Sequence, residues 1–218
     1  MEQIGVLNRV STVDALIQAF SNEIINGAWE PGVYCKDTDM AEKYGVSRNS
    51  VREAFSVLVE KGLLKRRNNK GFFVPVLGEE DVRELYEARL VIELAVIEEI
   101  TKRREVPSGM YEALDSLKLK TEEDLRNYIL APDFDFHMNM VQAIGNSRIM
   151  DMFEKLFMET QIINRQPHLY FSIDFIISEH EKIIEKILSG DVNDAKTVMK
   201  KHIDISIERQ IKELCARK

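Results

Sequence analysis

The sequence predicts a mainly α-helical protein of two domains: an N-terminal helix-turn-helix followed by a small β-hairpin, and a C-terminal bundle of helices. Three observations lead to this prediction. Apolar residues recur at three- and four-residue intervals along most of the chain, which is the period of an amphipathic helix. Two strand-like segments lie around residue 70, and basic residues concentrate between residues 43 and 70.

Composition places the protein among globular proteins with sizeable cores. Of its 218 residues, 44% are hydrophobic and 31% are charged, and the length fits two domains. No stretch approaches the length of a membrane span, and the first residues lack the basic-then-apolar pattern of a signal peptide. Cys35 and Cys215 form no CxxC motif and are expected to stay reduced. We therefore expect a cytoplasmic protein without a membrane partner.

Charge is distributed unevenly along this acidic chain, whose formal net charge is −7. Residues 1–77 carry 10 Lys and Arg against 9 Asp and Glu, whereas residues 78–218 carry 20 against 28. Within residues 43–70, eight basic residues face two acidic ones. Such a segment is the electrostatic footprint expected of a surface that binds a polyanion, although charge runs are more often simply solvated.

The first predicted helix begins at Ser11 or Thr12, either of which can cap it, and Gly27 ends it. Its apolar positions follow the helical period: Val13, Leu16, Ile17, Phe20 and Ile24. The segment WEPGVY then predicts an extended connection.

The next two predicted helices form a helix-turn-helix. Asp37 or Thr38 can cap the second helix, and Gly45 after it suits the left-handed conformation of a sharp turn. Ser47 is a good N-cap for the third helix, which Gly62 closes. The apolar stripe of this third helix is Val51, Ala54, Phe55, Leu58 and Val59.

Polar side chains crowd the exposed start of the third helix. Arg48, Asn49 and Arg52 avoid the apolar stripe and lie where a recognition helix meets base edges and phosphates. The following LLKRRNNKGFFVPV predicts two short strands joined by a turn. Such a hairpin makes a wing whose basic tip (Arg66, Arg67 and Lys70) can reach phosphates or the minor groove.

Residues 12–75 resemble the winged helix of the GntR superfamily of bacterial regulators. The segment MAEKYGVSRNSVREAFSVLVEKGLLKRRNNKGFFV follows that family's motif without a gap. Asn49-Ser50 stands where the family often has Thr-Pro, and Thr38 where it often has arginine; both departures concern the operator sequence. With the resemblance, the expected DNA-contacting residues are Ser47, Arg48, Asn49, Ser50, Arg52, Arg66, Arg67, Lys70 and Gly71.

Pro75 and Gly78 mark the predicted boundary between a DNA-binding domain of residues 1–77 and a helical effector-binding and dimerisation domain of residues 78–218. Nearly every later segment has the helical period, which predicts an all-α bundle. The expected helices are 81–104, 108–119, 121–130, 132–144, 147–164, 173–188 and 192–215. On the first of them, Arg89 and Glu93 fall in phase with the apolar face. They form an ion pair, or the arginine points into a ligand cavity.

Three of the four histidines recur at compatible positions. Asp133 and His137 lie four residues apart, so they share one face of a helix. His180 and His202 lie ten residues before and twelve after Gly190, heights of about 15 and 18 Å in an antiparallel helical hairpin. One carboxylate and three imidazoles can bind zinc, nickel or manganese and leave coordination positions open. Taken singly, each histidine is more simply explained as a core residue.

The second half resembles the FCD-type ligand-binding domain of the FadR branch. DFDFH, EHEKIIEKILSGD and MKKH match the places of its metal ligands, and AIGNSRI matches the Gly-Asn between them. The resemblance implies a divalent metal bound by Asp133, His137, His180 and His202 beside an effector cavity, and we expect Arg89 and Asn146 to contact the effector. His168 is expected to take no part, and Pro132 would displace the neighbouring carboxylate if it lay mid-helix.

These expectations combine into a metal-dependent transcriptional repressor that binds a palindromic operator as a homodimer and responds to a small carboxylate. A metal-dependent hydrolase remains an alternative, with Glu93, Glu179 or Glu181 as its general base. A metal-free regulator that responds to acyl-CoA is the other alternative, which the complete Asp and His set disfavours.

Overall fold

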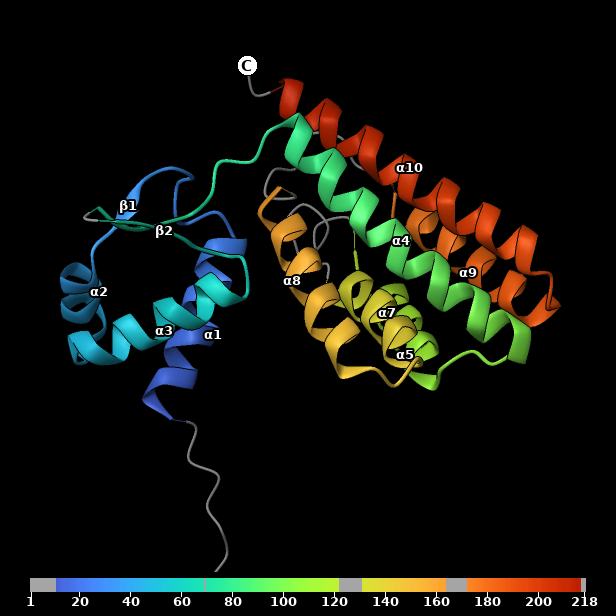
Figure 1. Cartoon of the computed structure of the whole chain (residues 1–218), viewed down its shortest axis with the longest axis horizontal. Coiled ribbons are helices and arrows are strands. Elements are labelled where there is room, and N and C mark those ends of the chain that lie inside the picture. Colours follow the sequence, from blue (N-terminus) through green and yellow to red (C-terminus); the bar gives the residue numbers. More distant parts are fainter. Residues whose placement is uncertain (1–10, 69, 122–130, 164–171, 217–218) are drawn as a thin grey trace, which may run out of the picture. The chain divides into compact units, whose positions relative to one another are not determined.

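The computed structural model describes residues 11–68, 70–121, 131–163 and 172–216. The chain divides into two compact units, Met1–Val76 and Leu77–Lys218 (Figure 1). The mainly helical fold with a small sheet in the N-terminal unit confirms the predicted fold class. No described helix is long and apolar enough to cross a membrane.

The N-terminal unit contains three helices and a three-stranded sheet. The helices are α1 (Thr12–Ile25), α2 (Asp37–Tyr44) and α3 (Arg48–Glu60). The strands β1 (Tyr34–Cys35), β2 (Lys65–Arg67) and β3 (Gly71–Phe73) pair antiparallel in the order β1-β3-β2. The hairpin β2–β3 is the predicted wing. The segment expected to be only an extended connection supplies β1, which pairs Tyr34 with Phe73.

Local interactions explain the ends of these helices. The Ser11 hydroxyl caps α1 by accepting from the Asp14 N–H at 3.0 Å, and the Ser47 hydroxyl caps α3 by accepting from the Ser50 N–H at 3.1 Å. Gly45, between α2 and α3, has a φ of +64°, which a residue with a Cβ would adopt only with strain. The predicted cap of α2 is wrong, because Asp37 is already its first helical residue.

An aromatic cluster forms the core of the N-terminal unit. Phe20 of α1 packs against Trp29 and against Phe55 of α3, with ring centres 5.3 and 5.4 Å apart. Phe72 of β3 packs on Phe55 at 5.0 Å. Phe20 and Phe55 are fully buried. The cluster therefore joins α1 to α3 and α3 to the sheet, and it leaves the outer face of α3 free for polar side chains.

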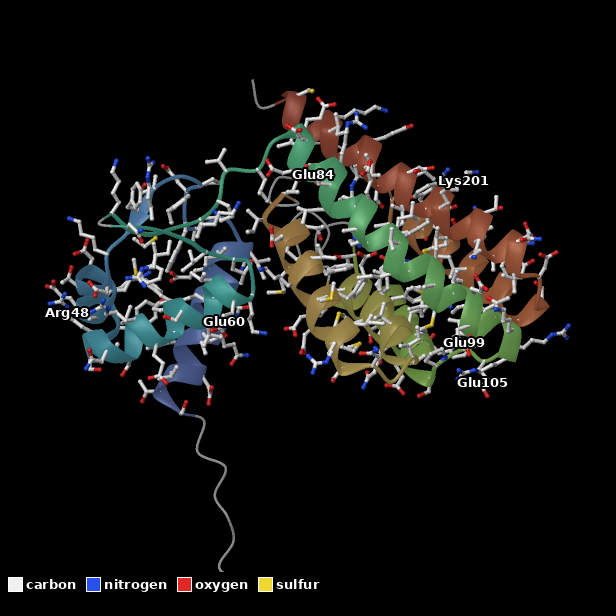
Figure 2. The ribbon with its side chains drawn as sticks, viewed as in Figure 1. Arg48, Glu60, Glu84, Glu99, Glu105 and Lys201 are labelled. Carbon is white, nitrogen blue, oxygen red and sulfur yellow. The ribbon has the colours of Figure 1, made fainter. Side chains whose placement is uncertain are left out.

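The C-terminal unit is a bundle of helices. Its described helices are α4 (Glu79–Arg103), α5 (Ser108–Lys118), α7 (Ala131–Gln142), α8 (Ser147–Ile163), α9 (Ile173–Ser189) and α10 (Val192–Ala216). The two longest, α4 and α10, lie side by side, and α4 begins at the end of the bundle where α10 finishes (Figure 1). Charged residues such as Glu84 and Lys201 are exposed on these two helices (Figure 2).

Two predictions for this unit concern residues 121–132. The helix predicted over 121–130 lies almost entirely outside the described residues. Pro132 is not mid-helix, since it is the second residue of α7. The first turn of a helix contains N–H groups that have no partner within the helix, so a proline there removes no bond. Asp133 therefore lies on a regular turn, four residues before His137.

Candidate DNA-binding surface and metal centre

The exposed start of α3 carries the predicted recognition residues. Arg48, Asn49 and Arg52 are exposed, with 63% and 57% of the two arginine side chains open to solvent. Arg48 projects outward from its unit (Figure 2). Ser50 is half-buried, and its hydroxyl lies 2.8 Å from that of Ser47, so both serines hold the start of the helix.

One acidic residue contacts both arginines. The Asp37 carboxylate, at the start of α2, lies 3.5 Å from Arg48 Nη2 and 3.6 Å from Arg52 Nε. Asp37 was expected only to cap α2, so its contact with the two arginines was not predicted from the sequence. The carboxylate brings the two guanidinium groups together on one side of the helix-turn-helix before any DNA is bound.

The wing presents further positive charge. Arg66 and Arg67 of β2 and Lys70 in the turn are all exposed. The Arg66 guanidinium lies 5.7 Å from the centre of the Phe72 ring. Gly71 starts β3 with a φ of +100°, a conformation that favours glycine. The wing therefore offers basic side chains on a defined hairpin.

Three predicted metal ligands meet inside the C-terminal unit. His137 of α7, His180 of α9 and His202 of α10 each offer a ring nitrogen, and these atoms lie within 4.8 Å of one another. The Nε2 atoms of His137 and His202 are 3.2 Å apart. His137 and His180 are fully buried. Three separate helices thus bring their imidazoles to one point.

Oxygen atoms next to Nδ1 orient two of the histidine rings. His137 Nδ1 lies 2.8 Å from a carboxylate oxygen of Glu93, and His180 Nδ1 lies 2.9 Å from the carbonyl oxygen of Ile176. When Nδ1 donates to these oxygens, each Nε2 has a free lone pair that faces the cluster. The buried Nε2 of His180 has no hydrogen-bond partner, which is costly in a protein interior unless another group occupies the site.

Asp133 lies at the edge of this cluster. Its Oδ1 is 3.4 Å from His180 Nε2, and its side chain is about a quarter exposed. The structure therefore brings the predicted carboxylate next to the imidazoles, where it also lines a cavity. Nitrogen and carboxylate oxygen donors together suit a divalent transition metal.

Burial keeps two of the imidazoles in the form that a metal requires. Burial lowers the pKa of His180 to about 4, against an opposing effect of Asp133. Burial also lowers the pKa of His202 well below its usual range, and the positive charges of Arg89 and Arg209 add to this effect. Both rings are therefore neutral at pH 7, and metal binding there does not have to displace a proton.

Arg89 and Glu93 combine both of the roles left open by the sequence. Arg89 donates from Nε to Glu93 Oε1 at 3.0 Å, and its Nη2 lies 2.9 Å from the same oxygen. Arg89 also lines a cavity. Burial raises the pKa of Glu93, but His137 and Arg89 outweigh it and lower the pKa to about 2. Glu93 is therefore an ionised bridge between the arginine and the histidine cluster. Its contact with His137 was missed because it depends on how α4 packs against α7.

The cavity lies directly beside the histidines. Arg89, Asp133, His137 and His202 line it, together with these residues: Tyr86, Phe157, Phe175, Ile176, Glu179, Ile205, Ser206 and Arg209. The Arg89 guanidinium lies 4.2 Å from the centre of the Phe157 ring, which fixes its direction. The cavity therefore joins a nitrogen-rich end to aromatic walls and basic side chains.

Asn146 does not belong to the described lining. Its side-chain oxygen accepts from the N–H groups of Arg148 and Ile149, at 3.1 and 3.3 Å, and so it caps α8. His168 lies outside the described residues. Ser206 and Arg209 were missed, although their positions four and seven residues after His202 place them on the same face of α10.

Comparison with known protein families now decides the classification. The family model described as the FCD domain matches residues 84–205, more than half of the chain. The model described as bacterial regulatory proteins, gntR family, matches residues 12–74. The chain is a GntR-family regulator with an FCD domain. It is accordingly a DNA-binding transcriptional regulator, as its α3 surface and wing had suggested.

Curated relatives of this GntR-family regulator cover most of its length. The HTH-type transcriptional regulator YdhC of Bacillus subtilis is 27% identical over 194 residues, 85% of this chain and 84% of the relative. The gluconate operon transcriptional repressor of Bacillus licheniformis is 27% identical over 193 residues, 85% of this chain and 79% of the relative. The regulator LutR of Bacillus subtilis is 26% identical over 206 residues, 83% of this chain and 92% of the relative.

Solved structures share the fold. A GntR protein from Rhodococcus sp. RHA1 has a TM-score of 0.77 at 24% identity and covers 92% of this chain and 97% of its own. E. coli McbR has a TM-score of 0.72 at 18% identity, and the match covers 94% of this chain and 99% of McbR. At these identities the likeness concerns the fold alone.

Proposed function

We propose that this GntR-family regulator is a repressor whose operator binding is controlled by a small organic acid bound beside a divalent metal. The observation that carries the proposal is the cluster of three buried histidines, His137, His180 and His202. This cluster lies next to a cavity that Arg89 lines. The relatives named as gluconate operon repressors support the class of effector, since gluconate is a small organic acid.

The residues present fit a divalent ion, which His137, His180, His202 and Asp133 would hold. When bound, the ion supplies positive charge and open positions for acid oxygens. The Nε2 atom of His180 then gains the partner that it lacks. Zinc, nickel and manganese all accept such ligands, so the donor set alone favours none of the three.

The protein's own groups would orient the acid. A guanidinium has five N–H donors, and Glu93 engages only Nε and Nη2 of Arg89. The remaining donors can bind a carboxylate oxygen of the ligand in the cavity. Because Glu93 contacts both Arg89 and His137, a shift of one on ligand binding is passed directly to the other.

Two observations disfavour the alternative functions. The three glutamates considered as general bases each contact a positively charged or histidine side chain: Glu93 with Arg89 and His137, Glu179 with Lys182, and Glu181 with Lys118. The cavity is also small: the volume in which the centre of a water molecule can lie is about 40 Å³. One water needs roughly 10–15 Å³ by this measure, so the space is far smaller than an acyl-CoA.

The test uses the purified full chain and DNA that it selects from a random pool. Metal content is measured first, and DNA binding is then followed by fluorescence anisotropy with and without a panel of small organic acids. We expect at least one acid to change DNA affinity in the metal-loaded protein and to have no effect after chelation, because the acid binds through the ion.

Asp133→Asn and Asp135→Asn form a matched pair for this test. Both remove one negative charge from α7, but Asp133 lines the cavity whereas Asp135 is exposed two residues on. Asp133→Asn should weaken metal binding and the acid response, and Asp135→Asn should change neither. A purified protein that contains no metal and takes up no zinc, nickel or manganese would contradict the proposal.

A further inference from the structure

A second positive group faces the cavity at a distance from the histidines. His202, Ser206 and Arg209 of α10 are spaced by four and three residues, so their side chains share one face of the helix. At 1.5 Å per residue, Arg209 lies about 10 Å further along the helix axis than His202. The lining provided by α10 therefore starts at the metal cluster and ends at an arginine.

The neighbouring helix α4 lines the same path. Glu93 contacts His137 at the cluster, and Arg89 and Tyr86 follow one and two turns earlier on α4. Because α4 begins where α10 ends, moving from Glu93 to Tyr86 has the same direction as moving from His202 to Arg209 (Figure 1). An ion pair between Glu98 and Lys196 joins the two helices. Arg89 thus lies between the histidine cluster and the level of Arg209.

The charges that line the cavity favour a ligand with more than one negative charge. Arg89 and Arg209 oppose Asp133 and Glu179, so these four side chains cancel one another. The ion pairs are Arg89 with Glu93 and Lys182 with Glu179, so adding the charges of Glu93 and Lys182 leaves the sum at zero. A divalent ion at the histidines would then add two positive charges that these six described side chains do not balance. Enclosed charge is stable only when it is balanced, and a dianion would balance it.

The walls between the two ends are apolar. They consist of side chains from four helices: Tyr86, Phe157, Phe175, Ile176 and Ile205. Such walls favour carbon atoms in the middle of a ligand and leave its polar groups to the ends.

We infer that the effector carries two acidic groups on a short carbon chain, the first at the histidine cluster and the second at Arg209. This inference rests on the proposed function and adds the class of ligand and a specificity-determining residue. The second acidic group is a carboxylate or a phosphate, both of which a guanidinium binds through paired hydrogen bonds.

Matched pairs of acids test the inference. L-malate is compared with L-lactate, 2-hydroxyglutarate with 2-hydroxybutyrate, and 3-phosphoglycerate with glycerate. Within each pair the 2-hydroxy acid end is identical, and only the second acidic group differs. Affinities for the metal-loaded full chain are measured by calorimetry, with zinc, nickel and manganese in turn.

We expect at least one doubly acidic compound to bind about tenfold or more tightly than its partner, as charge-assisted hydrogen bonds commonly provide. Arg209→Gln should close most of this gap, because it lowers the affinity of the doubly acidic compound much more than that of its singly acidic partner. Arg209→Lys, which keeps the charge but not the fork of donors, should retain part of the gap and also covers the case in which the glutamine variant does not fold. Lys212→Gln is the control, because it removes one positive charge from an exposed position of the same helix.

Three results would overturn the inference, and they separate it from the proposed function. If the members of every pair bind alike, the effector has no second acidic site, although metal-dependent acid sensing stands. If the gap persists in Arg209→Gln, the second group binds elsewhere in the cavity. If none of the six acids binds the metal-loaded protein, both the inference and the proposed function fail. Whether malate or 3-phosphoglycerate shows the larger gap distinguishes a carboxylate from a phosphate.

Discussion

Arg52 is the residue at which DNA recognition by this protein can be tested most directly. Its guanidinium projects from the exposed start of α3, near Arg48 and 3.6 Å from Asp37. If Arg52 reads a base edge, Arg52→Ala should weaken operator binding by about 1–3 kcal/mol, the usual contribution of a bidentate arginine. Fluorescence anisotropy with operators that each carry one altered base pair should show relaxed specificity at a single position.

The control for this substitution is Arg103→Ala. Arg103 is an exposed arginine of α4 that pairs with Glu99, so its removal changes the charge but not the α3 surface. An equal loss on all sequences, with a smaller dependence on salt, would assign Arg52 to a phosphate. Unchanged binding would mean that α3 is not the recognition helix.

Individual residues were predictable where their role depends on one helix. The position of Arg52 relative to the apolar stripe of α3 was enough to predict its exposure. Asp37 and Glu93 were not assigned their contacts, because each reaches a side chain on a different helix. Sequence spacing gives the face of a helix, but it does not say which neighbour covers that face.

At the scale of elements, Glu23 joins α1 to α2 and to the connection between them. Its carboxylate accepts from Trp29 Nε1 at 2.6 Å, from the Tyr44 hydroxyl at 2.7 Å and from Lys43 Nζ at 2.8 Å. Burial raises its pKa, but these three bonds outweigh burial and lower the pKa below its usual value. The ionised form is therefore the one that stabilises the helix-turn-helix.

Glu23→Gln should lower the free energy of unfolding of the N-terminal unit by about 1–2 kcal/mol at pH 7, since it weakens bonds to a charged group. A carboxyl whose pKa is lowered on folding stabilises fully above its unfolded pKa, and this contribution is lost as the pH falls through the folded pKa. The difference between wild type and variant should therefore shrink below about pH 4.

Urea unfolding of the full chain can follow this unit selectively, because Trp29 is its single tryptophan and contacts Glu23 directly. Glu42→Gln, an exposed glutamate of α2, provides the comparison. If the difference in the free energy of unfolding between wild type and Glu23→Gln stays constant from pH 7 to pH 3, the charge of Glu23 does not contribute to stability.

Elements were predictable when they were long and periodic. The boundaries of α1 and α3 follow from Ser11 and Ser47, whose caps the structure contains. Strand β1 was missed because two residues are too few for an alternating pattern, and it exists only through its pairing with β3. The predicted start of α7, residue 132, lies one residue after the observed start at Ala131, and both starts place Pro132 in the first turn.

At the scale of the whole molecule, the bundle should remain folded without its metal. Its core contains large buried side chains on several helices, among them Ile97, Phe136 and Phe153, so folding does not depend on the ion as it does in a zinc finger. Chelation should leave the helical circular dichroism signal in place and abolish stabilisation by the organic acid. His202→Ala should lower metal affinity in the same way.

Lys201→Ala, on the exposed side of α10, is the neighbouring control and should bind metal normally. A loss of helicity on chelation would make the ion structural. The histidine arrangement itself was accessible from the sequence, because straight helices on either side of Gly190 bring His180 and His202 level by simple arithmetic. Arg89 of α4 was expected to face a ligand cavity, but the contact between Glu93 and His137 was not predicted, since it depends on how α4 packs against α7.

A two-fold dimer is the assembly that this regulator should form on its operator. One winged helix buries too little surface on DNA for high specificity, so regulators of this kind commonly pair two copies on a palindrome. Sedimentation should therefore give twice the chain mass of 25.2 kDa, and binding should fall steeply when one of the two half-sites is scrambled. In a dimer the effector needs only to change the separation of the two α3 helices, because the half-sites fix that separation at one or more turns of DNA. A monomer both in solution and on the operator would exclude this mode of control and leave each α3 to bind alone.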